Sequence, residues 1–349
     1  MELLSVTMND GVMPRSEIEG KDNSSEDKSN YKVVLTGDMV YNSMRMWQGA
    51  NGISPCDGIV SPAYTVLMPK IPISNGYFAA LFKSPNLINE FRKNSQGMTS
   101  DTWNLKYPQI ETIKVSIPTL QEQERIADML GTLEKRITKQ VQLVDSLKKY
   151  KRGVVSAILS HQIIFSDADG KPYPEWTSCT LQDAVDFLDG QRKPLESADR
   201  ARRQGAYPYY GASGIIDYID DYIFDEPLLL LGEDGANIIN RSTPLCFIAT
   251  GKYWVNNHAH VMRPKKGHNI KFLCELLESL DYTRYNTGTA QPKLNQEKCR
   301  GIELVLPIYE EQCRIAAFLS SLDQKLEREQ DTLNCLLLLK RGMMQQLFI

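Results

Sequence analysis

An internal repeat constrains this chain more than any other feature of its sequence. Residues 118–159 match residues 307–348 without a gap, at a constant offset of 189 residues. A self-match of this length at one fixed offset indicates a duplicated structural module and a chain built from two halves. Identical positions include Gln123/Gln312, Arg125/Arg314, Ile126/Ile315, Leu130/Leu319 and Lys151/Lys340.

Each copy of the repeat predicts one long helix, because a proline precedes it and no proline interrupts it. Apolar residues recur in alternating steps of four and three, which is the heptad seam of a coiled coil. Polar residues interrupt both seams at matched places, Gln140/Glu329 and Lys151/Lys340. If the helices pair antiparallel, we expect Lys151 to face Glu329 and Lys340 to face Gln140. The alternative is two amphipathic helices, each packed on its own domain.

The segments between the helices predict two globular heads. Short β-like runs separated by turn residues are followed by a helical stretch, residues 77–94 in one head and 270–280 in the other. Each head then has a loop and a short strand, 113–117 or 302–306, before the repeat. We therefore predict an α/β (α+β) protein in which two long helices form an antiparallel coiled coil with pseudo-twofold symmetry. Its parts are a first head (1–117), a first spacer helix (118–160), a second head (161–306) and a second spacer helix (307–349).

Composition excludes several classes of protein. The seven cysteines are scattered and form no C-x-x-C pair, so reduced cysteines are favoured over a disulfide framework or a zinc ribbon. No apolar run reaches the roughly 20 residues of a membrane span, and the N-terminus does not resemble a signal peptide, so we expect a cytoplasmic protein. The net charge of −3 argues against a protein that grips nucleic acid unaided.

Motifs for catalysis are absent from the sequence. It contains no Walker A loop, no Asn-Pro-Pro-aromatic tetrad of an amino-methyltransferase and no G-x-S-x-G elbow. Glu19-Gly20-Lys21 imitates the end of a nuclease motif but has no Pro-Asp partner nearby. His258 and His260 form an H-x-H pair, for which a strand with alternating faces is favoured over a metal site. We therefore predict a binding protein that is not an enzyme.

Both heads contain side chains suited to reading DNA. Arg and Lys bind guanine, Asn and Gln bind adenine, and Lys, Arg, Thr and Tyr hold phosphates. The candidate DNA-binding residues are Asn42, Arg45, Gln48, Gln191, Arg192, Lys193, Tyr210, Asn237, Arg241, Thr289, Gln291 and Lys293. The second head has 16 Lys and Arg residues against 20 Asp and Glu. Strong binding should therefore need a partner that adds positive charge, because phosphate neutralisation dominates affinity.

The chain resembles the DNA-specificity subunits of Type I restriction–modification systems. The resemblance is carried by IPTLQEQERIADML at 117–130 and LPIYEEQCRIAAFLSSLD at 306–323, each followed by Lys-Arg-Gly. EWTSCTLQDAVDFLDGQRKP at 175–194, YPYYGASGIIDYI at 207–219 and GKYWVNNHAHVMRP at 251–264 are also similar to the family. The resemblance to this family extends over nearly the whole chain.

The resemblance implies a non-catalytic subunit whose two target-recognition domains each read half of a bipartite DNA site. It implies two methyltransferase subunits docked on the helices, and motor–nuclease subunits that complete the complex. S-adenosylmethionine, ATP and magnesium would then belong to those partners, and this chain would bind no cofactor or metal itself. The expected partner-binding residues are Gln123, Arg125, Ile126, Leu130, Gln312, Arg314, Ile315 and Leu319. The alternative is an adaptor with two ligand-binding domains on a coiled coil and no DNA; a fused restriction–modification enzyme is disfavoured by the missing motifs.

The two heads begin differently. The second head opens with Trp176 and Leu181 and then reaches Gly190, whereas the first head reaches its matching Gly11 almost at once. We therefore expect the first head to lack a counterpart of the Trp-containing opening strand.

Overall fold

The computed structural model describes residues 1–8, 10–20, 22, 24–288 and 291–348, with the backbone alone at residue 101. The chain divides into two compact units. The first comprises Met1–Leu143 and Glu329–Ile349, and the second comprises Val144–Arg328. Each unit combines one head with part of each long helix, so this division differs from the four-part prediction, which stays a prediction.

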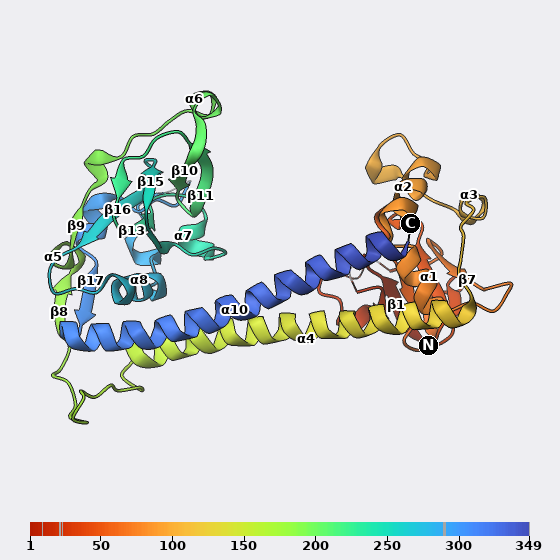
Figure 1. The fold of residues 1–349 in the computed structure, drawn as a ribbon, viewed down its shortest axis with the longest axis horizontal. Coiled ribbons are helices and arrows are strands. Elements are labelled where there is room, and N and C mark those ends of the chain that lie inside the picture. The colour runs from red at the N-terminus through yellow and green to blue at the C-terminus, as the bar shows by residue number, and fades with distance from the viewer. Residues whose placement is uncertain (9, 21, 23, 289–290, 349) are drawn as a thin grey trace. The chain divides into compact units, whose positions relative to one another are not determined.

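The head of the first unit contains two small sheets, ordered β2-β1-β6-β3 and β5-β4-β7 (Figure 1). Its strands are β1 (Glu2–Val6), β2 (Val12–Pro14), β3 (Lys32–Val34), β4 (Met39–Asn42), β5 (Asn51–Ile53), β6 (Gly58–Val60) and β7 (Tyr64–Leu67). Its helices are η1 (Arg15–Glu17), η2 (Met46–Gln48), α1 (Asn75–Leu81), α2 (Pro85–Asn94), η3 (Ser100–Thr102) and α3 (Tyr107–Ile110). The predicted helical stretch 77–94 is two helices, because Ser84 caps α2 and Pro85 starts it.

The head of the second unit contains sheets ordered β11-β10-β15-β12, β14-β13-β16-β9 and β17-β8. Its strands are β8 (Thr177–Thr180), β9 (Val185–Phe187), β10 (Gln204–Gly211), β11 (Gly214–Ile219), β12 (Phe224–Asp225), β13 (Leu228–Gly232), β14 (Cys246–Ala249), β15 (Lys252–Val255), β16 (Ala259–Pro264) and β17 (Glu303–Leu306). Its helices are α5 (Leu181–Ala184), η4 (Asp189–Gln191), α6 (Ser197–Arg202), α7 (Asn237–Asn240), α8 (Ile270–Ser279), η5 (Thr283–Tyr285) and α9 (Gln296–Arg300).

The two heads share a core plan. In each, the central strand, β4 or β13, pairs antiparallel with the next strand along the chain and with a later one, β7 or β16. In the second head α8 packs on this sheet, where Phe272 and Leu273 join Leu229 and Leu231 in one apolar core (Figure 1). The run Leu228–Leu231 is wholly buried, as expected for a central strand covered on both faces.

The repeats form the two longest helices, α4 (Leu120–Leu159) and α10 (Tyr309–Leu347). This confirms the predicted long helices and the mixed α/β fold. The predicted seam is also confirmed, because every seam residue is buried or half-buried. In the first unit Leu133 and Ile137 of α4 pack against Leu333 and Leu336 of α10. Contacts run in opposite directions along the two helices there, since Glu134 meets Lys340 and Gln140 meets Glu329.

The predicted pairing of the polar seam residues is wrong. Gln140 donates to the Glu329 carboxylate at 2.7 Å and to its carbonyl at 2.9 Å, so matched positions meet each other. Lys151 instead binds Glu275 and Asp323 of its own unit, and Lys340 binds Glu134. The reason is register: the pairs Lys151–Asp323 and Lys340–Glu134 are equivalent under the 189-residue offset, so each lysine meets the acidic residue at the other repeat's matching position.

The ends of the long helices also pack on the heads. In the first unit Ile126 and Leu130 join the core of the head, as do Met344 and Phe348. In the second unit Val154, Ile158, Ile315 and Leu319 lie in the core of the head. Helix pairing and packing on the domains, posed as alternatives from the sequence, therefore both occur. Across the described residues, no helix is both long enough and apolar enough to span a membrane.

Candidate nucleic-acid interface

Four loops of the second head converge beyond the end of the central strand β13. They are residues 189–193, 233–236, 256–258 and 291–296. Asp234 forms a bridge with Lys293, Gly235 N–H donates to the Pro292 carbonyl at 3.0 Å, and Glu233 N–H donates to the His258 carbonyl at 2.8 Å. Segments far apart in the sequence thus form one continuous surface.

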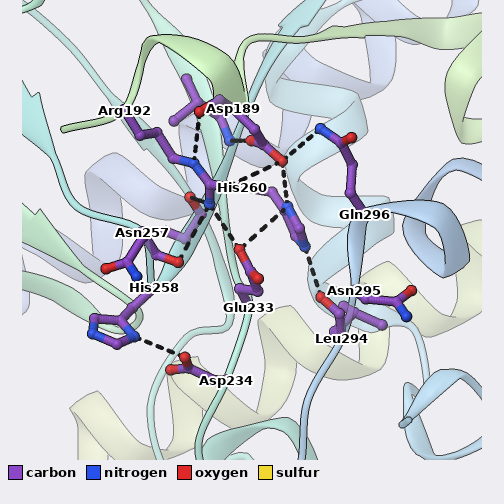
Figure 2. Close-up of polar contacts among 12 residues, drawn as sticks. Asp189, Arg192, Glu233, Asp234, Asn257, His258, His260, Leu294, Asn295 and Gln296 are labelled. Atoms are coloured by element: carbon purple, nitrogen blue, oxygen red, sulfur yellow. Dashed lines mark hydrogen bonds and ion pairs between the residues drawn. The ribbon is translucent and has the colours of Figure 1, made fainter. Parts of the chain in front are cut away.

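A buried charge cluster holds these loops together, as Figure 2 shows. The carboxylate of Asp189 accepts hydrogen bonds from His260 and from the Gln296 side chain, each at 2.7 Å, and from the Val261 N–H at 2.8 Å. Arg192 donates to Glu233 and to the Ala259 carbonyl, each at 2.8 Å. The side chains of His260 and Asp189 are only 1% and 6% exposed. Buried charges at this depth are tolerated because each one is paired and hydrogen-bonded.

His260 carries a proton on both ring nitrogens. Nδ1 faces the Asp189 carboxylate and Nε2 faces the Leu294 carbonyl, each at 2.7 Å, and both of these oxygens only accept. Burial by itself lowers the pKa of His260, but the hydrogen bond that His260 donates to the Asp189 carboxylate, together with its interaction with Cys299 and the charge of Asp189, raises that pKa to about 10. For Asp189 burial acts in the opposite direction and raises the pKa. The hydrogen bond and the charge of His260 outweigh burial, so the pKa of Asp189 lies below its usual value. The resulting buried ion pair joins β16 to the loop at 189–193, and the hydrogen bond from His260 to the Leu294 carbonyl joins β16 to the loop at 291–296.

The converging loops present polar side chains on their outer side. Gln191, Lys193, Asn257, Gln291 and Lys293 are exposed. His258 is half-exposed and its Nδ1 lies 2.7 Å from the Asp234 carboxylate. Amide and ammonium groups of this kind are the ones that read adenine and guanine edges or hold phosphates. The buried cluster fixes their backbone, so they need little reordering on binding.

The first head has an equivalent place, beyond the end of its central strand β4. Asn42 accepts from Met44 N–H at 3.0 Å, and the Leu105 N–H donates to the Ser43 carbonyl at 2.8 Å, which joins the loop at 96–104 to residues 43–48. Here aromatic packing replaces the charge cluster. Trp47 meets Trp103 edge-on with ring centroids 5.1 Å apart, and the Arg92 guanidinium lies 5.7 Å from the Trp47 ring. Arg45 is exposed and Gln48 half-exposed beside this stack.

Four of the candidate DNA-binding residues have structural roles instead. Arg192 is in the buried cluster, and Arg241 binds the Glu278 carboxylate and carbonyl and lies over the Tyr282 ring. Asn237 holds the loop that follows it through bonds to Thr243, and the Tyr210 ring packs on Tyr253 and Phe247. These four side chains are therefore engaged within the fold, and their predicted contact with DNA stays a prediction. Thr289 lies outside the described residues.

The predicted partner-binding residues are also mostly internal. Leu130, Ile315 and Leu319 are core residues, and Ile126 packs against the core. Gln123 and Gln312 are 2% and 1% exposed. Each donates to the carbonyl of the proline five residues earlier, at 2.9 Å, and accepts from the capping residue of a helix in its own head, Ser74 at 3.0 Å or Asn269 at 2.8 Å. Their shared role is to fasten head to helix, and of the predicted set only Arg125 and Arg314 are exposed.

Sequence reasoning missed Trp47, Trp103, Asn257 and the structural role of Asp189. The two tryptophans lie near glycine-containing loops, and this could have marked Trp47 and Trp103 as candidates. Nothing in the local sequence marks Asp189 as the partner of His260, which is 71 positions away. The H-x-H pair does not act together, since His258 meets Asp234 and His260 meets Asp189. Among the described residues, no group of three or more His, Cys, Asp or Glu could hold a metal ion.

Comparison with known proteins assigns the class of protein that this fold and these loops define. The family model of the Type I restriction modification DNA specificity domain matches residues 6–147 and 173–337. The chain therefore belongs to this family, and each of the two matched segments covers most of one head.

Individual relatives agree with the family. A protein of Haemophilus influenzae named as a type I restriction enzyme specificity subunit is 33% identical over 149 residues, which is 42% of this chain and 37% of that protein. The EcoprrI specificity subunit of Escherichia coli is 27% identical over 44% of this chain and 41% of its own length. The chain thus matches less than half the length of these two relatives. The crystal structure of an S subunit from M. genitalium has the same fold, with a TM-score of 0.62 and 16% identity over 91% of this chain and 84% of that one.

Proposed function

We propose that this chain is the non-catalytic DNA reader of a Type I restriction–modification complex. Its first head (1–117) and second head (161–306) would each read one half of a bipartite site. One observation carries the proposal: both heads repeat the same strand plan, yet the loops beyond β4 and β13 present different exposed side chains. A duplicated frame with two different reading surfaces suits two different half-sites.

The residues proposed to contact DNA are those that remain on the surface. They are Asn42, Arg45 and Gln48 in the first head, and Gln191, Lys193, Gln291 and Lys293 in the second. Asn257 and His258 are added because they lie on the same surface. A bidentate contact from such a side chain to the matching base edge would discriminate against the wrong base by about 1–3 kcal/mol.

Partners supply what this chain lacks. The net charge of −3 predicts weak DNA binding alone, so methyltransferase and motor–nuclease subunits would add the positive charge, S-adenosylmethionine, ATP and magnesium. Arg125 and Arg314 are exposed candidates for the docking of those subunits on the long helices. Leu337, Leu338 and Leu339 of α10 are 46%, 62% and 52% exposed, and an apolar triplet of this kind favours a protein partner. Such a complex would work in the cytoplasm.

Methylation mapping tests the proposal in cells that carry this chain with its methyltransferase. We expect a bipartite methylated motif, which disappears when residues 161–306 are deleted. The double variant Gln291→Ala/Lys293→Ala should weaken methylation about tenfold or more and relax only one half of the motif. Arg45→Ala/Gln48→Ala should affect only the other half. Lys171→Ala, an exposed lysine outside the loops, is the matched control.

Two outcomes would reject the proposal. Methylation that persists unchanged after deletion of the second head would exclude a reading role for that head. Loss of specificity at both half-sites from either double variant would show that the heads do not read separate targets.

A further inference from the structure

The segment that leads into the long helix is covered in the second head. There β17 pairs antiparallel with β8, with Val305 opposite Ser178. The Leu181 N–H donates to the Ile302 carbonyl at 2.8 Å, and the Leu181 side chain is fully buried. Ile302, Leu304 and Leu306 are consequently 0%, 2% and 3% exposed. An added strand and one leucine therefore seal this edge of the head.

Within the described residues, no strand covers the matching segment of the first head. By the 189-residue offset, Ile113, Val115 and Ile117 correspond to Ile302, Leu304 and Leu306. Among the strands that the structure describes, none pairs with residues 113–117. Val115 is 40% exposed, and Ile113 and Ile117 are half-buried against the core. The predicted strand at 113–117 is thus not formed, because a strand needs a partner for its backbone groups.

A second difference lies beside this segment. In the second head Trp176, just before β8, packs on Phe272 with centroids 5.8 Å apart and on His161 with centroids 4.6 Å apart. Glu311, at the start of α10, is 4% exposed and its pKa is raised by burial, with the Trp176 indole among its neighbours. The equivalent residue of the first head, Glu122, is exposed. The first head therefore lacks cover at both the strand edge and the glutamate.

We propose that residues 113–117, with Glu122, form a strand-accepting site. Its ligand is an extended polypeptide segment with the chemistry of residues 176–181: a tryptophan that reaches the glutamate, a short polar strand, and a leucine that covers Val115. Strand addition at an exposed edge is a general mode of peptide recognition, with backbone bonds supplying affinity and side-chain pockets supplying specificity. The chain itself supports this ligand, since its second head seals the equivalent edge in this way. The site does not depend on DNA reading by either head.

A peptide-binding experiment on the full chain tests the site. The probe is a fluorescein-labelled peptide of residues 174–184, followed by fluorescence anisotropy. We expect saturable binding, and about tenfold or weaker binding of the same peptide with Leu181→Asp, because burial of one leucine stabilises a complex by that much or more. Hydrogen exchange should slow at residues 114–117 when the peptide binds and stay unchanged at residues 303–306.

Two variants of the chain give a matched pair. Val115→Asp should abolish binding, because residue 115 corresponds to the buried Leu304. Ser116→Asp should leave binding unchanged, because residue 116 corresponds to the outward-facing Val305, which is 46% exposed. Both positions are exposed in the free chain, so folding is expected to persist.

The proposal is overturned if the peptide and its Leu181→Asp form bind equally. It is also overturned if hydrogen exchange changes at residues 303–306, because the peptide would then act at β17 by replacing β8 in the second head. It is also overturned if the chain forms dimers through residues 113–117 and binds no peptide, as sedimentation would show.

Discussion

The two heads are attached to the long helices in the same way but are stabilised differently inside. Gln123 and Gln312 make the same pair of hydrogen bonds, to a proline carbonyl and to the capping residue of a head helix. Beyond the central strand, however, the second head uses a buried ion cluster around His260, and the first uses the Trp47–Trp103 pair. The two copies thus share the attachment to the helices but differ in the loops that we propose to read DNA.

The largest effect that tests this comparison is expected at His260. His260→Leu leaves the buried Asp189 carboxylate without its main partner, so the second head should lose about 3–5 kcal/mol in free energy of unfolding. Urea denaturation measures this through Trp176 and Trp254 in a Trp47→Phe/Trp103→Phe background. The control Asp199→Asn breaks an exposed ion pair with Arg202 in the same head and should cost less than about 1 kcal/mol. Equal small losses would show that the cluster does not stabilise the second head.

The pH dependence of stability should also separate the heads. The pKa of His260 is raised from 6.5 to about 10, so its stabilising contribution is fully present below pH 6.5 and is lost as pH rises through about 10. The second head should therefore become less stable over that range. Urea midpoints recorded at several pH values with the second-head tryptophans measure this slope. His260→Gln should flatten it, and an unchanged slope in that variant would assign the effect to another group.

Because Gln123 and Gln312 attach their heads in the same way, replacing either one should lower the free energy of unfolding of its own unit by the same amount. Gln123→Ala and Gln312→Ala each leave one N–H and one carbonyl, at least partly buried, without this side-chain partner, which should cost about 1–3 kcal/mol in each unit. Tryptophan fluorescence of the corresponding head, with the other pair replaced by Phe, follows each unit separately. A loss confined to one unit would mean that the two glutamines are not equivalent.

The smallest effects should distinguish the two seam lysines. Lys151 binds Glu275 at 2.7 Å and Asp323 at 2.6 Å and is 21% exposed, whereas Lys340 binds Glu134 and is 35% exposed. Lys151→Met should cost about 1–2 kcal/mol, and Lys340→Met less than about 1 kcal/mol. Thermal unfolding in low and high salt compares them, with the Lys340 variant expected to show the smaller change. The reverse order would contradict the difference in burial.

The sequence determined the features that depend on local pattern and duplication. The 189-residue repeat and its heptad seam predicted α4 and α10. The short β-like runs between turn residues, together with the family resemblance, predicted two mixed α/β heads. These predictions are confirmed because hydrophobic periodicity and internal repeats depend only on the order of residues along the chain.

Only the tertiary structure decided which polar residues face outward. Some side chains of the types that bind ligands are instead hydrogen-bonded within the fold. Arg192 and Arg241 bind residues far away in the sequence, and Gln123 and Gln312 bind the capping residues of head helices. Likewise, the partners of Lys151 and Lys340 depended on the register between helices, which no single helix specifies. The reason is physical: whether a charge is exposed, or buried and paired, depends on long-range neighbours, and a linear pattern does not contain them.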